Sequence, residues 1–274
     1  MYCGRPTCVY RCIKGKFEKY VEDGWEISDR YERAVQDPEF VEITKKEADK
    51  HVGQQRLRIK LGTNPASWPT HCLIQYPKEF DAQIDLVAQA LDVVADNPIL
   101  ARELVLKVNS ESMKRWYIDV ALRSGYWRAE HSGIKGVDEK SSTPRATPSD
   151  NQLDELFERD NWRCRYCGIR MGGRREHFEK FAAAIDLPEL VAGSNDETRH
   201  GIRLILQASH DHIQPLNQGG SNNQDNLVTS CWGCQFGKGD HSLDALAIKN
   251  PIYSKWEPHE NWKGLLIRRQ GAHR

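Results

Sequence analysis

Residues 209–240 read SHDHIQPLNQGGSNNQDNLVTSCWGCQFGKGD, and this stretch contains the motifs from which the fold is predicted. It places two histidines around Asp211, followed by a Gly-Gly turn, an Asn-Leu dipeptide and a Cys-x-x-Cys pair. The apolar residues just before it predict a strand running into the histidines: Ile202, Leu204 and Leu206. NLVTSC (residues 226–231) predicts the returning strand, and a helix is expected after Cys231. The expected order is therefore strand, loop, strand, helix.

The Cys-x-x-Cys spacing occurs twice, at Cys164 and Cys167 and again at Cys231 and Cys234. Two thiolates three residues apart on a tight turn can face one ion, and two such turns complete a tetrahedral four-sulfur zinc site. A closed site of this kind is structural because it leaves no position for water. Four unrelated buried thiols are the alternative, and the doubled spacing favours zinc. The ion would clamp the helix after Cys231 against the turn at Cys164.

The dipeptide Asp211-His212 combines two groups that phosphodiester hydrolysis requires. A carboxylate is a hard oxygen ligand for Mg²⁺ or Mn²⁺, and an imidazole is a base near neutral pH. Together they can take a proton from water and stabilise charge on a phosphate. An Asp-His pair alone is more typical of a capped turn or of a pair that supports a site, but its fixed distance before the Asn-Leu dipeptide and its position between two cysteine pairs favour a catalytic site.

This combination resembles the HNH endonuclease motif, which usually reads D-H-I-x-P, Gly-Gly, N-L, C-x-x-C-N-x-x-K-G. FERDNWRCRYCG (residues 157–168) is similar to the first cysteine turn of the same branch. The resemblance covers roughly residues 150–240 and nothing in residues 1–130. It implies a ββα-metal finger whose reaction is metal-assisted cleavage of a DNA backbone, and occasionally of RNA.

The resemblance also implies a role for each matching residue. His212 corresponds to the general base, and Asp211 corresponds to a ligand of the single catalytic divalent ion. Asn226 matches the middle asparagine, which ties the loop to the histidine strand and orients the base. The two cysteine pairs match the structural zinc ligands: Cys164, Cys167, Cys231 and Cys234.

Gln235 is a departure from the family pattern, which has Asn or His at this position as a second ligand of the divalent ion. A glutamine carbonyl is also a hard oxygen ligand, but it is one methylene longer than asparagine. Three interpretations are open: Gln235 coordinates, or another residue such as His210 or His241 substitutes, or the site is impaired. The leading hypothesis is thus a metal-dependent HNH endonuclease. The alternative is a zinc-stabilised DNA-binding module with impaired or no catalysis.

Basic residues near these motifs are candidates for phosphate contacts. Those singled out as nucleic-acid-binding are Lys238, Arg163 and Arg165. A solvated surface is the alternative for each of them. The cysteines at positions 3, 8 and 12, with Cys72 or His71, have a looser spacing that leaves a second zinc site open.

The fold class predicted for the whole chain is α+β, in two domains. Residues 1–130 are expected to form an α+β domain that selects or regulates the target. Strands are predicted at 57–61 and 70–77, and helices at 84–94, 96–108 and 112–125, the last ending at Gly125. Residues 131–149 are rich in Ser, Thr, Pro and Gly and predict a linker. Residues 150–274 would form the nuclease domain, opening with a helix capped by Ser149 or Asp150.

The composition limits the class of protein and its expected partners and location. The chain has 274 residues, with 39 basic and 39 acidic side chains, so a zero net charge argues against a uniformly basic nucleic-acid binder. The N-terminal stretch lacks the apolar core of a signal peptide, and no apolar run reaches the roughly 18 residues of a membrane span. Eight cysteines in such a chain indicate metal ligands or free thiols. We therefore expect a cytoplasmic protein with structural Zn²⁺, catalytic Mg²⁺ or Mn²⁺, and DNA in preference to RNA as partner; homodimerisation is left open.

Overall fold

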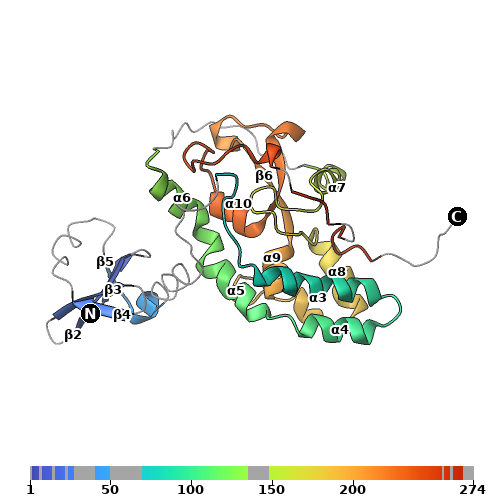
Figure 1. Ribbon diagram of the computed structural model, residues 1–274, viewed down its shortest axis with the longest axis horizontal. Coiled ribbons are helices and arrows are strands. Elements are labelled where there is room, and N and C mark those ends of the chain that lie inside the picture. The colour runs from blue at the N-terminus through green and yellow to red at the C-terminus, as the bar shows by residue number, and fades with distance from the viewer. Residues whose placement is uncertain are drawn as a thin grey trace. The chain divides into compact units, whose positions relative to one another are not determined.

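A computed structural model describes residues 2–5, 8–13, 16–21, 24–27, 41–49, 70–134, 148–254, 256–259 and 262–267 (Figure 1). The chain divides into two compact units, Met1–Asn64 and Pro65–Arg274. Among the described residues, no helix is both long enough and apolar enough to cross a membrane.

The first unit contains a five-stranded antiparallel sheet with the strand order β4-β3-β2-β1-β5. Its strands are β1 (Tyr2–Arg5), β2 (Cys8–Ile13), β3 (Lys16–Val21), β4 (Gly24–Ile27) and β5 (Val41–Ile43). The first four strands follow one another as a meander, and β5 returns to pair with β1. The strand predicted at 57–61 lies outside the described residues, as do the side chains of Cys3 and Cys8 that the second zinc site would need.

The second unit begins with the helices α3 (Glu79–Val93), α4 (Pro98–Leu106), α5 (Ser110–Asp119) and α6 (Ser124–Ser132). The predicted cap at Asn97 is confirmed, because its side chain accepts a hydrogen bond from the Leu100 amide and Pro98 occupies the first helical position. The predicted strand at 70–77 is wrong, since this segment is irregular.

The predicted helix end at Gly125 is also wrong. The chain breaks earlier, in the single turn η2 (Ala121–Arg123), and Gly125 then lies inside α6. A Cβ atom at Gly125 would lie 1.8 Å from the carbonyl oxygen of Gly237. This glycine therefore permits close contact between two helices and does not end one.

The remainder of the second unit carries the motifs. Its helices and strands are α7 (Asp150–Arg159), α8 (Arg175–Ala184), η3 (Pro188–Leu190), α9 (Gly201–Leu206), β6 (Ala208–His212), η4 (Leu216–Gln218), η5 (Gln224–Asn226), β7 (Leu227–Cys231), α10 (Trp232–Lys238) and η6 (Pro251–Tyr253). Of the two predicted caps, Ser149 is the one that caps α7, and it forms a reciprocal capping box with Gln152. β6 and β7 pair antiparallel, from Ala208 opposite Cys231 to His212 opposite Leu227. With α10 they form the predicted ββα unit, and the α+β fold class is confirmed.

The segment before the histidines differs from the prediction, because residues 201–206 form the helix α9 and not a strand. Every residue of α9 is buried, and all of them except Arg203 are apolar or glycine. A six-residue run that is buried all round shows no period by which helix and strand can be distinguished. Gly201 lets the start of α9 approach the Ser110 carbonyl, from which an added Cβ would lie only 1.9 Å away.

The helices of residues 79–132 pack against the ββα unit within the same compact unit. α5 packs on α9, and α10 packs on η2 and α6 (Figure 1). Arg170 donates to the Asp85 carboxylate at 2.6 Å, and Arg128 donates to the Leu246 carbonyl at 2.9 Å. The compact units thus divide at residue 64, whereas the sequence predicts a division at 131–149. Whether 131–149 links separately folding parts stays a prediction, and residues 135–147 lie outside the described residues.

Candidate functional site

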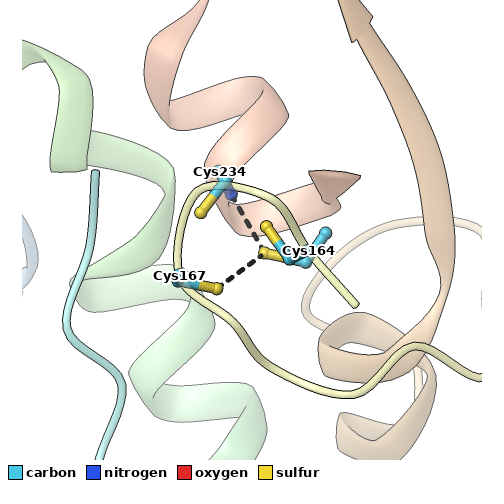
Figure 2. Close-up of side chains that lie close together, drawn as sticks. Cys164, Cys167 and Cys234 are labelled. Carbon is cyan, nitrogen blue, oxygen red and sulfur yellow. Dashed lines mark hydrogen bonds between the residues drawn. The ribbon is translucent and has the colours of Figure 1, made fainter. Parts of the chain in front are cut away.

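The four predicted zinc cysteines come together in one buried cluster. Their Sγ atoms all lie within 4.8 Å of one another. Cys164 and Cys167 stand on a turn closed by a 2.8 Å hydrogen bond from the Gly168 amide to the Cys164 carbonyl. Cys231 ends β7 and caps α10, because its Sγ accepts a hydrogen bond from the Cys234 amide. Figure 2 shows Cys164 and Cys167 on the turn facing Cys234 on α10.

The spacing of the sulfur atoms fits a metal ion. Zn–S bonds of about 2.3 Å in a tetrahedron place the sulfur atoms about 3.8 Å apart. The Sγ atoms of Cys167 and Cys231 are 3.9 Å apart. Burial raises the pKa of Cys167 well above its ordinary value; at Cys164, hydrogen bonds from the other three thiols outweigh burial and lower the pKa. A bound divalent cation would therefore displace protons from the cluster. Four buried sulfur ligands leave no open position, as in a structural site.

Asp211 lies on β6 with its side chain inside the protein, 6% exposed. Its Oδ2 accepts a hydrogen bond from the Tyr166 hydroxyl at 2.5 Å and forms an ion pair with the Lys238 Nζ at 3.2 Å. Burial raises the pKa of Asp211, although Lys238 and Tyr166 both act to lower it. Burial next to the Asp211 charge also raises the pKa of Tyr166 well above its ordinary value, so its hydroxyl keeps its proton and donates. Tyr166 stands between Cys164 and Cys167, and the cysteine turn thus contacts the Asp211 carboxylate directly.

The three basic residues predicted to bind nucleic acid are all engaged within the protein. Lys238 is 1% exposed, and its Nζ donates to the His212 carbonyl at 2.8 Å in addition to its ion pair with Asp211. Arg163 donates to the Gly168 carbonyl, and Arg165 donates to the carbonyls at positions 251 and 252. These side chains hold the cysteine turn and the histidine strand in place. A phosphate contact is therefore not supported for Lys238, because its ammonium group is directed away from solvent.

His212 is half-buried at the end of β6, and one ring nitrogen bonds to another side chain. Its Nε2 lies 2.7 Å from the Oδ1 of Asn222, and its ring centroid lies 5.6 Å from that of His210. Burial, and then the neighbouring His212, lower the pKa of His210. Asn222 was missed from the sequence, because a Ser-Asn-Asn loop carries no signal that singles out one amide.

Asn226 ties the loop after β6 together. Its Oδ1 accepts from the Gln214 amide at 2.8 Å, and its Nδ2 donates to the carbonyls of Gln214 and Ser221. These bonds hold the loop itself, and the role of Asn226 in orienting the base stays a prediction. Gln235 lies on α10, and its Nε2 donates to the His210 carbonyl at 2.8 Å, so its side chain reaches across to β6. Joint coordination of an ion by Gln235 and Asp211 stays a prediction.

The comparisons with known proteins bear on the segment from α9 to the end of α10. Residues 199–240 match the model of the HNH endonuclease family. The chain carries an HNH domain. No curated protein and no solved structure matches the chain significantly. The HNH domain indicates nuclease-type activity on a nucleic acid, and its ββα unit contains Asp211, His212, Asn226 and Gln235.

Among the described residues, the four cysteines are the one group of three or more His, Cys, Asp or Glu side chains that lie close enough together to hold an ion. Asp211 and His212 form no such group. A site with a single carboxylate, such as Asp211, suits a hard ion such as Mg²⁺. This ion typically binds one or two carboxylates and completes its coordination shell with water and substrate phosphate. The cysteine cluster and the candidate site at Asp211 and His212 therefore suit chemically different ions.

Proposed function

We propose that the chain is a metal-dependent HNH endonuclease that hydrolyses DNA phosphodiester bonds, with His212 as the general base and Zn²⁺ in the cysteine cluster. One observation carries the proposal. The half-buried imidazole of His212, oriented by Asn222, directly follows the buried Asp211 on β6, a strand that the Gln235 amide also contacts. A base, a carboxylate and an amide oxygen are the groups that metal-assisted hydrolysis uses.

The donor set around Asp211 fits a hard divalent ion. Both contacts described for its carboxylate fall on Oδ2, so Oδ1 is the oxygen available to coordinate. Tyr166 and Lys238 fix the carboxylate in one orientation, which is the preorganisation that a metal ligand requires. Gln235 would add an amide oxygen from α10. A bound Mg²⁺ or Mn²⁺ would stabilise the charge that develops on the scissile phosphate.

The residues of the chain would perform the remaining steps. His212 takes a proton from a water molecule, and the resulting hydroxide forms a new P–O bond with the scissile phosphorus. The 3′ oxygen leaves with the bonding electrons. Asn222 and Asn226 act before the reaction, by holding the imidazole and the loop that follows it. The Lys238 Nζ, bonded to the His212 carbonyl, fixes the backbone of the base.

Plasmid cleavage with the zinc-loaded protein in Mg²⁺, Mn²⁺ or Ni²⁺ tests the proposal. His212→Ala is expected to abolish cleavage, whereas His259→Ala, a matched change at a partly exposed histidine outside the ββα unit, is expected to leave it intact. Cleavage by His212→Ala at the wild-type rate would show that the base is wrongly assigned. Parallel DNA and RNA substrates establish which nucleic acid is cut.

A second candidate function is a zinc-stabilised DNA-binding module without catalysis. Two observations favour it: the Gln235 amide bonds to a backbone carbonyl, and the charge of Asp211 is balanced by Lys238. This candidate predicts salt-dependent DNA binding with no cleavage in any metal. Gln235→Asn, which places the shorter amide of the family pattern at this position, would then be expected to gain activity. Cleavage by the wild-type protein would exclude it.

A further inference from the structure

The helix α10 carries an exposed aromatic side chain directly after Gln235. Phe236 is 56% exposed, although neighbouring residues of the helix are buried. The packed side of α10 is held tightly, because a Cβ at Gly233 would lie 2.7 Å from the Ala121 Cβ and one at Gly237 would lie 2.2 Å from the Ser124 Oγ. The helix is therefore fixed in place while Phe236 presents its ring to solvent.

Trp232 supports Phe236 from one turn earlier on the helix. Their ring centroids are 6.2 Å apart in an edge-to-face arrangement. The guanidinium carbons of Arg199 and Arg203 lie 5.2 and 5.8 Å from the centroid of Trp232. Arg203 is buried and bonded to Gln207, so the tryptophan is held from within the protein. We call Trp232 and Phe236, with these two arginines, the aromatic platform.

The position of the aromatic platform indicates what binds it. Gln235, the residue before Phe236, contacts the strand that carries His212, so the platform stands on the helix that packs against this strand. Aromatic rings and guanidinium groups are the surfaces on which nucleobases stack. A base inside a continuous duplex has both faces covered by its neighbours, whereas an unpaired base can offer a free face to Phe236 without the cost of unstacking. A nucleic acid is also the substrate that the HNH domain indicates.

We propose that the aromatic platform stacks on an unpaired nucleobase next to the phosphodiester that the HNH domain acts on. This inference rests on the proposed function and makes it more specific. It names a substrate that is single-stranded, or unpaired locally, at the cleavage position. The protein would then favour such DNA over a continuous duplex of the same sequence.

Binding, measured apart from cleavage, tests this inference. The zinc-loaded full chain is titrated without added divalent metal into a fluorescein-labelled single-stranded oligonucleotide, and into its duplex, and anisotropy is recorded. Phe236→Ala should weaken single-strand binding roughly tenfold, the loss expected for one stacked base. Phe236→Trp should retain it, and Phe236→Leu, which keeps apolar surface without a π face, should not. Tyr253→Ala is the control, since Tyr253 is 80% exposed on η6.

The outcomes separate the inference from the function on which it rests. Equal binding by Phe236→Ala and the wild-type protein would overturn the platform and leave the nuclease proposal standing. Equal affinity of the wild-type protein for single strand and duplex would also overturn it. Absence of any nucleic-acid binding by the wild-type protein would overturn both proposals. Zinc content and melting temperature of each variant show whether weaker binding comes from misfolding, and the failure of Phe236→Trp to bind despite a wild-type fold would count against stacking.

Discussion

Lys238→Met removes an ammonium group from a side chain that is 1% exposed and leaves the rest of its length in place. Two interactions disappear, the ion pair with Asp211 at 3.2 Å and the hydrogen bond to the His212 carbonyl at 2.8 Å. The Asp211 carboxylate stays behind, 6% exposed and bonded only to Tyr166 among the described partners. The variant therefore contains a buried carboxylate without its cation.

The expected loss of stability is large for a single substitution. Removing one partner of a buried ion pair typically costs about 3–5 kcal/mol, because the remaining charge is uncompensated. Asp211→Asn in the same protein leaves a neutral amide, so the double variant should be destabilised by less than the sum of the two single variants. Lys249→Met, a change at an exposed lysine, should shift stability by no more than about 0.5 kcal/mol.

Urea unfolding of the zinc-loaded wild-type protein and the four variants measures these free energies, and DNA binding at several salt concentrations supplies a second readout. An inward-facing Lys238 predicts a lower unfolding midpoint and an unchanged salt dependence of binding. A lysine that contacts phosphate predicts the reverse: an unchanged midpoint and a slope of log K against log salt that falls by about one. This second pattern would refute the placement of Lys238.

Three further predictions concern stability. A chelator that strips zinc should remove one ion per chain and unfold α10 together with the cysteine turn, seen as lost helical circular dichroism; a metal-free protein with an unchanged spectrum would contradict the four-sulfur site. Burial, aided by Lys114, lowers the pKa of His200 to about 4, so the protein should lose up to about 3 kcal/mol as the pH falls from 6.5 toward 4. His200→Asn keeps an α9 cap and should flatten that profile in urea unfolding, while an identical pH profile would count against the buried neutral imidazole. Gly125→Ala should lower the melting temperature by several degrees, since a Cβ 1.8 Å from the Gly237 carbonyl forces α6 away from α10 at a cost of about 1–3 kcal/mol; an unshifted melting curve would argue against that contact.

Local chemistry explains which features could be predicted from the sequence. The cap at Ser149, the start of α4 at Pro98 and the pairing of the two Cys-x-x-Cys motifs depend on residues that are close in sequence or share a doubled spacing. Such signals are read directly from residue type. The ββα order was predictable for the same reason, because turn residues and cysteines mark the boundaries of β6, β7 and α10.

The features that were missed depend on tertiary packing. Gly125 has the residue type of a helix end, and only the approach of Gly237 from 112 positions away explains why it lies within a helix. α9 is buried on every side, so its sequence shows no helical period. Lys238, the last residue of α10, has the sequence position of a phosphate-binding residue, yet its ammonium group pairs with Asp211 on β6. Side-chain direction at these positions is a property of the assembled core and not of the local sequence.

The location of Tyr166 between two cysteines limits how the HNH domain can be recombined with other proteins. Its hydroxyl reaches the Asp211 carboxylate from the same five-residue turn that supplies two sulfur atoms to the cluster. The turn and the histidine strand are consequently not interchangeable parts. A chimera that imports another protein's cysteine turn can preserve the sulfur geometry and still lack the donor to Asp211, so the two segments are expected to function only as a matched set.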